Sequence, residues 1–113
     1  RTLTGHQQAQ AERFGVEIID MAAWTRGERP QVSGPVYLSV DLDVLDPAFA
    51  PGVSHWEPGG LSTRDLLTLI QSLTCPVVGA DVVECNPHRD PSGLTAMVAA
   101  KVVKELTAVM RRS

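Results

Sequence analysis

The sequence predicts an α/β fold built around a mainly parallel sheet. Two apolar runs, Val36–Val40 and Val77–Val83, are typical of buried strands, and helical patterns lie between and after them. Strands that alternate with helices favour parallel pairing, because parallel strands are joined by a crossover connection that is usually helical. A sheet of about three strands is small for this architecture. We therefore expect the 113 residues to be part of a larger domain.

The N-terminal third predicts a helix and a short strand. Residues Thr4–Phe14 are polar and favour a helix, and Gly15 stands where a helix C-terminus needs a left-handed residue. Residues Val16–Ile19 then predict a short strand. The following segment, Thr25–Gly34, is rich in Gly, Arg and Pro and predicts an exposed loop.

The remainder predicts a long loop and two helices. Residues Ala48–Gly60 contain several Pro and Gly residues without periodicity, and loops of this length are usually functional. Ser62–Asp65 forms a capping-box pattern at the start of a helix. A final amphipathic helix is expected over Thr95–Met110. The apolar faces of the two helices are Leu66, Leu67, Leu69, Ile70 and Leu73, and Val98, Val102, Leu106 and Val109.

Composition excludes several classes of partner. The net charge is −3 with no basic stripe, and aromatic residues make up 4%, which argues against nucleic-acid binding. No apolar run approaches the length needed to cross a membrane. The first residues show no signal-peptide pattern and no initiator Met, so we expect the chain to be cut from something longer. We expect Cys75 and Cys85 to be reduced thiols rather than a disulfide.

Asp41 and Asp43 are the candidate metal ligands. They follow an apolar strand directly, and alternation along a strand would place both carboxylates on one face, roughly 6–7 Å apart at their Cα atoms. Two anions that close repel each other unless a cation intervenes, and carboxylates suit magnesium, calcium and manganese. Acids at a strand end also cap turns. We assign that structural role to Asp46, which precedes Pro47.

A second interpretation of the same residues is a phosphotransferase of the haloacid-dehalogenase type. Residues Asp41–Leu45 resemble its first motif, in which Asp41 would accept the phosphoryl group and Asp43 would act as a general acid. The later motifs of that class are not matched, because no strand-end Lys follows and Gly79–Glu84 falls short of its last motif.

Glu84 and His55 are the candidate substrate-binding residues. Glu84 ends the second strand, at the same sheet edge as Asp41 if the strands are parallel. A carboxylate beside a metal site suits a guanidinium group, whose paired N–H donors match it in fork geometry. A Glu before Asn-Pro also caps turns. His55 lies in the long loop, where a single His is more often a surface residue than a ligand.

These segments together resemble the arginase/agmatinase (ureohydrolase) family. Its signature is matched by Ser39–Pro47, Ala50–Gly52, Gly59–Leu61 and Glu84–Pro87. The chain is most similar to plant-type arginases, and the likeness covers nearly its whole length. The further matching segments are Arg13–Glu17, Pro51–His55, Leu61–Asp65 and Thr95–Lys101.

The resemblance implies a three-layer αβα fold, of which residues 1–113 would be the C-terminal part of a single ureohydrolase domain. It implies two manganese ions, with Asp41 bridging both and Asp43 binding one. Glu84 would hold the guanidinium and His55 would line the pocket. The implied reaction is hydrolysis of L-arginine to ornithine and urea, with agmatine or another guanidino compound as the alternative substrate. Family members form trimers or hexamers, and the plant-type likeness implies a mitochondrial or else cytoplasmic location.

The sequence departs from the family in its metal ligands. The upstream motifs, of Gly-Gly-Asp-His and Asp-Ala-His-x-Asp type, do not occur, and a catalytic loop His is missing as well. Two carboxylates cannot satisfy two six-coordinate cations. We therefore assign no catalytic residue and expect the isolated chain to bind manganese weakly and to release no urea. The alternative outside enzymology is a truncated, non-catalytic subunit.

Overall fold

The computed structural model describes residues 2–112. They divide into two compact units, the first ending at Gln31 and the second beginning at Val32. The first unit holds helix α1 (Gly5–Phe14) and the short helix α2 (Met21–Thr25). The predicted helix is confirmed as α1. Thr4 and Gln7 form a capping box at its start, and Gly15 ends it with φ 66° and a backbone N–H bonded to the carbonyls of two preceding residues.

The prediction of a strand over Val16–Ile19 is wrong. The segment is irregular, and it leads into α2, which the sequence analysis did not anticipate. Asp20 starts that helix by accepting a hydrogen bond from the Ala23 backbone N–H at 2.7 Å. A segment rich in β-branched residues becomes a strand only where another strand pairs with it. The sheet of the described residues contains only β1 and β2, so residues 16–19 have no strand partner there.

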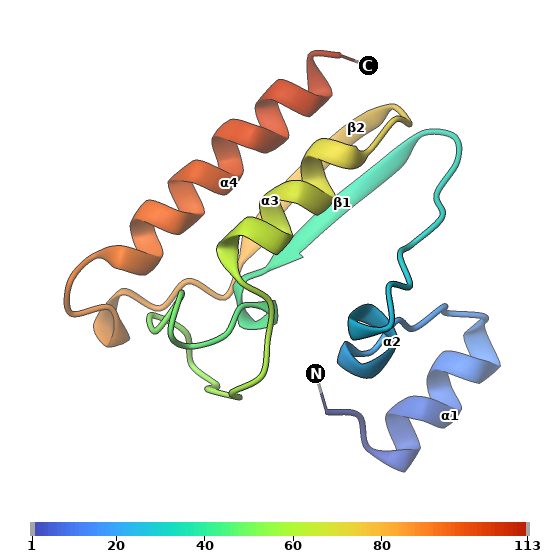
Figure 1. The fold of residues 1–113 in the computed structure, drawn as a ribbon, viewed down its shortest axis with the longest axis horizontal. Helices are drawn as coiled ribbons and strands as arrows, with labels where there is room; N and C mark the ends of the chain where they lie inside the picture. The colour runs from blue at the N-terminus through green and yellow to red at the C-terminus, as the bar shows by residue number, and fades with distance from the viewer. Residues whose placement is uncertain (1, 113) are drawn as a thin grey trace. The chain divides into compact units, whose positions relative to one another are not determined.

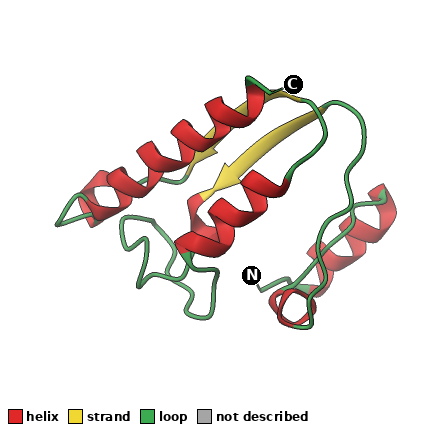
Figure 2. Ribbon diagram, turned by 45° about the horizontal axis from the view of Figure 1, so that its top comes forward, coloured by secondary structure: helices red, strands yellow, loops and turns green. Residues whose placement is uncertain are grey.

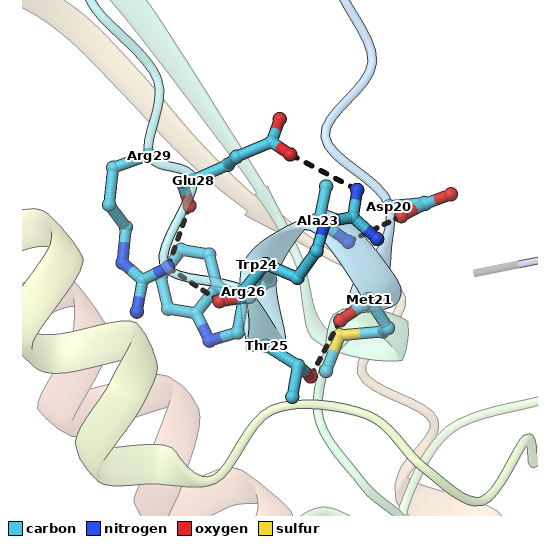
Figure 3. A network of polar contacts seen from close by, with 8 residues as sticks. All are labelled: Asp20, Met21, Ala23, Trp24, Thr25, Arg26, Glu28 and Arg29. Carbon is cyan, nitrogen blue, oxygen red and sulfur yellow. Dashed lines mark hydrogen bonds and ion pairs between the residues drawn. The ribbon is translucent and has the colours of Figure 1, made fainter.

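The first unit ends in a compact polar network around Arg29 (Figure 3). The Arg29 Nη1 donates to the carbonyl oxygens of Trp24 at 2.8 Å and Glu28 at 2.6 Å. Its guanidinium carbon lies 3.5 Å from the centroid of the Trp24 ring. An Arg stacked on an aromatic face in this way rigidifies a short loop.

The second unit confirms the α/β fold with a parallel sheet. Strand β1 (Val36–Asp41) pairs with strand β2 (Val77–Val83) in parallel, and the register aligns Asp41 with Val83. Helix α3 (Thr63–Ser72) connects them, and helix α4 (Leu94–Met110) follows β2. Both helices lie over the same face of the sheet, as Figures 1 and 2 show.

The core of the second unit lies between that face and the two helices. The apolar periodicity predicted for both helices is confirmed. The buried positions of the predicted faces are Leu66, Leu67 and Ile70 in α3 and Val98, Val102, Leu106 and Val109 in α4, and Thr95 of α4 is buried in addition. No described helix has the length and apolarity needed to cross a bilayer. Cys75 and Cys85 are free thiols, as expected. The largest fully buried side chains are Leu42, Leu45, Val53, Ile70, Val77, Thr95 and Val102.

The opposite face of the sheet carries a polar cluster. The Asp81 carboxylate accepts hydrogen bonds from the Ser39 hydroxyl at 2.6 Å and the Tyr37 hydroxyl at 2.8 Å. The Tyr37 ring lies over Gly79, where a Cβ atom would come within 2.8 Å of it. The cluster ties β1 to β2 on the face of the sheet opposite to α3 and α4 (Figure 2), so Asp81 has a structural role.

Acid should weaken the second unit through Asp81. The hydrogen bond from Ser39, and then that from Tyr37, hold the pKa of Asp81 below its ordinary value of 3.8. A lowered pKa in the folded state means that the stabilisation is present above about pH 4 and is lost as the pH falls through the folded value. We expect Ser39→Ala to raise the pKa of Asp81, measured by NMR titration of its carboxyl carbon. An unchanged pKa in that variant would contradict the assigned cause.

Candidate active site at the carboxyl ends of the strands

The parallel register places the predicted acidic residues at one edge of the sheet. Asp41 is the last residue of β1, and Glu84 comes one residue after Val83, its partner in β2. Both Asp41 and Glu84 are exposed. The expectation that Glu84 shares a sheet edge with Asp41 is therefore confirmed. In α/β folds this is the edge at which ligands bind.

Asp41 and Asp43 lie close together, but not as predicted from strand alternation. The strand ends at Asp41, and Asp43 lies in the 3₁₀ helix Leu42–Val44. The Asp41 Oδ1 caps this turn by accepting a hydrogen bond from the Asp43 backbone N–H at 2.8 Å. The prediction of a shared strand face is wrong, because the chain turns as soon as the apolar strand is finished. The side chain of Leu42 fills the core at this turn and is fully buried.

The donor set present at this edge fits part of a metal site. Asp41 is exposed and Asp43 is half-buried, so carboxylate oxygens of the kind that manganese and magnesium prefer lie at the strand end. Among the described residues no group of three or more His, Cys, Asp or Glu side chains could hold a metal ion. The two carboxylates can therefore supply ligands to a metal only together with donors from elsewhere.

Asp46 has the structural role predicted for it. Its Oδ1 accepts a hydrogen bond from Ala48 N at 2.9 Å, and its Oδ2 accepts one from Gly59 N at 2.8 Å. The backbone also pairs across the base of the loop, where Asp46 N donates to Leu61 O at 2.9 Å. These contacts close the long loop where it leaves and rejoins the fold.

The Glu84 backbone is in a left-handed conformation, with φ 70°. Of the described residues other than glycine, it is the one with positive φ. A side chain in this region costs about 1–2 kcal/mol relative to ordinary conformations. Unusual backbone of this kind collects at ligand-binding positions, and the role of Glu84 in substrate binding stays a prediction. The conformation also turns the chain away from the sheet, so strand alternation does not determine the direction of this side chain.

The segment after Glu84 binds the loop that carries His55. Asn86 N donates to Gly52 O at 2.7 Å, and the Asn86 side-chain amide donates to the Ser54 hydroxyl at 3.1 Å. His55 follows directly and is exposed. The structure thus brings the loop of one predicted substrate-binding residue against the segment of the other.

Thr95 holds the loop that carries His55 at Gly52, and it was not among the residues predicted for the site. Its buried hydroxyl accepts a hydrogen bond from Gly52 N at 2.7 Å. Asp90 accepts hydrogen bonds from the N–H groups of Thr95 and Ala96 at 2.9 Å each, and the first of these is the main reason that the pKa of Asp90 lies below its ordinary value. A Thr at the first turn of a helix is a usable signal for capping, but its partner 43 residues away is not visible in sequence.

Comparison with known proteins shows the family to which the chain belongs. A model described as the Arginase family matches residues 1–108. The chain belongs to the Arginase family. It is 51% identical to "Arginase 1, mitochondrial" of Arabidopsis thaliana, over 96% of this chain and 34% of that protein.

Two solved structures confirm the fold at high similarity. The arginase of Medicago truncatula superposes with a TM-score of 0.88 and 45% identity, covering 97% of this chain and 37% of that one. A triple mutant of the T. brucei arginase-like protein, bound with Mn²⁺, gives a TM-score of 0.86 at 38% identity, covering 96% and 40% of the two chains. The chain thus spans about a third of the length of the relatives it matches. Its sheet and helices are part of the αβα arginase fold.

Gly52 is a position where any side chain should disturb the junction. A Cβ atom there would lie 2.5 Å from Asp90 Cβ and 2.9 Å from Thr95 Cβ. We expect Gly52→Ala to lower the free energy of unfolding by about 1–3 kcal/mol through overpacking, measured by urea denaturation. Gly5→Ala is the control, because nothing lies within 4 Å of a Cβ atom at Gly5. Equal stability of both variants would contradict the close approach.

Glu84→Gly should show whether the Glu84 side chain contributes to the stability of the fold. Glycine adopts positive φ without the Cβ penalty, so we expect the variant to be as stable as the parent chain or more stable by about 1 kcal/mol. Val83→Gly, in the adjacent extended residue, should instead destabilise by about 1 kcal/mol. Both are compared by urea denaturation, and a strong loss of stability in Glu84→Gly alone would show that the carboxylate holds the fold.

Proposed function

We propose that this chain supplies the substrate-binding edge of a manganese-dependent ureohydrolase. The observation that carries the proposal is the placement of Asp41 and Glu84 after two neighbouring parallel strands, in a chain of the Arginase family. Asp41 and Asp43 would be metal ligands, and Glu84 and His55 would bind the substrate. The triple mutant of the T. brucei arginase-like protein bound with Mn²⁺ supports manganese as the cation.

The proposed substrate is L-arginine, which would be hydrolysed to ornithine and urea. Support comes from the plant relatives, which are named arginases and are 45–52% identical to this chain. Agmatine or another guanidino compound is the alternative. The guanidinium group is common to all of these substrates, so the role proposed for Glu84 is the same in each case.

The residues of this chain would act by binding and orientation. When bound, manganese supplies the activation of a water molecule as a nucleophile near neutral pH. The Glu84 carboxylate would accept two parallel hydrogen bonds from the guanidinium and present its central carbon for attack. Asp41 and Asp43 would hold the cation at the edge of the sheet. We expect the remaining ligands to come from residues outside this chain, because the described residues hold no complete cluster.

The incomplete set of metal ligands among the described residues favours a second candidate, a non-catalytic subunit. A chain with two metal-site carboxylates and no third partner among the described residues would be inactive alone. Co-purification with a chain that carries the missing His motifs would support this alternative. For the intact enzyme we propose a homotrimer or homohexamer and a mitochondrial location, the latter supported by the names of the plant relatives.

Membership of the Arginase family, matched over residues 1–108, favours a ureohydrolase over the phosphotransferase. An acid-labile phosphoryl group on Asp41 would be the finding that revives it.

Urea release tests the proposed function. We expect no urea from the 113-residue chain with L-arginine and manganese. We expect urea from a chimaera in which the chain replaces the matching segment of the Medicago truncatula arginase. Glu84→Gln in the chimaera should lower kcat/KM by about 30-fold or more, since a charged partner of the guanidinium is lost.

The control is Glu105→Gln. Glu105 lies in α4 and pairs with Lys101 of the same helix and with Gln71 of α3, neither of which is a predicted site residue, so the variant should keep the activity of the chimaera. Turnover by the isolated chain would contradict the need for outside ligands. A chimaera that folds and binds manganese but releases no urea would overturn the proposed function.

A further inference from the structure

Arg89 fastens the loop that carries His55 to the segment that carries Glu84. We call residues 51–57 the His55 loop. The Arg89 Nη1 donates to the Ser54 carbonyl oxygen at 2.7 Å, and the guanidinium carbon lies 4.0 Å from the centroid of the Trp56 ring. These two contacts lie immediately before and immediately after His55. One side chain therefore restrains His55 from both sides.

Both ends of this contact are themselves fixed. The Trp56 indole N–H donates to Pro51 O at 2.8 Å, so the ring is held by its own loop. Arg89 belongs to the 3₁₀ helix Pro87–Arg89, and its backbone N–H donates to Asn86 O at 3.1 Å. Arg89 is half-buried, while Trp56 remains 56% exposed and leaves part of its ring toward solvent. The arrangement is a rigid link from the end of β2 to the His55 loop.

We propose that Arg89 is a positioning residue that sets the location of His55 relative to Glu84, and so tunes the affinity for the guanidino substrate. This inference rests on the proposed function. Arg89 contacts Ser54 and Trp56, the residues on either side of His55, so its proposed effect on substrate binding passes through the loop. A Lys cannot replace it, because a planar stack and a directed N–H donor are needed together.

The chain contains a matched control for this contact. Arg29 stacks on Trp24 and donates from Nη1 to the Trp24 carbonyl oxygen, the same combination of a ring contact and a backbone hydrogen bond (Figure 3). Arg29 belongs to the first unit, whereas the residues of the proposed site all belong to the second. Removing Arg29 therefore tests what the loss of such a pair does to stability alone.

The experiment compares Arg89→Ala, Arg89→Lys and Arg29→Ala in the active chimaera. We expect both Arg89 variants to raise KM for L-arginine about tenfold with kcat changed less than about threefold, because the groups that act on the reacting carbon stay in place. Arg29→Ala should leave both constants unchanged. Trp56→Phe keeps an aromatic face and should stay within about threefold of the parent KM, whereas Trp56→Ala should match Arg89→Ala.

A second measurement uses the 113-residue chain without turnover. Hydrogen exchange of backbone amides within the His55 loop should rise at least about tenfold in Arg89→Ala and stay unchanged in Arg29→Ala. Faster exchange with an unchanged KM would overturn the inference and leave Arg89 as a stabilising residue only. Unchanged exchange would overturn it as well. A chimaera with the parent chain that releases no urea would instead overturn the proposed function, and the inference with it.

Discussion

The parallel pairing of β1 with β2 is the constraint on which the candidate site depends. In a parallel pair both strands end at the same edge, so the residues that follow them meet whatever their separation in sequence. Asp41 and Glu84 are 43 positions apart and would be unrelated in an antiparallel hairpin. The register that aligns Asp41 with Val83 leaves Glu84 one residue beyond the sheet. The polar cluster of Tyr37, Ser39 and Asp81 holds this register from the open face.

The long loop becomes a defined surface because it is closed twice. Asp46 binds Gly59 at its base, and Asn86, Arg89 and Thr95 bind its middle. A loop of this length without such contacts would sample many conformations, and ordering it would weaken substrate binding. The same Pro and Gly residues that prevent regular structure permit close approach, as at Gly60, where a Cβ atom would lie 2.6 Å from Val44 O.

The local features of the fold were predictable from sequence, and the tertiary polar contacts were not. The capping box at Ser62, the glycine stop at Gly15 and the two apolar strands are patterns within a few residues, and the structure contains each of them. The strand expected over residues 16–19 failed because pairing depends on a partner that the sequence of the segment does not contain. The contacts of Arg89 with Ser54 and Trp56 join residues more than 30 positions apart. No periodicity or spacing marks them.

Glu84 shows how local strain and distant contacts are combined at this edge. Extended backbone at residue 84 would continue β2 and carry Asn86 away from the His55 loop. The left-handed turn redirects the chain, so that Asn86 meets Gly52 and Ser54. Its cost of about 1–2 kcal/mol is comparable to the net contribution of the two hydrogen bonds that Asn86 then makes, at roughly 1 kcal/mol each. The conformation is therefore stable only while the loop is in place. The conformations of the His55 loop and of Glu84 therefore depend on each other, and a substitution in either should change the conformation of both.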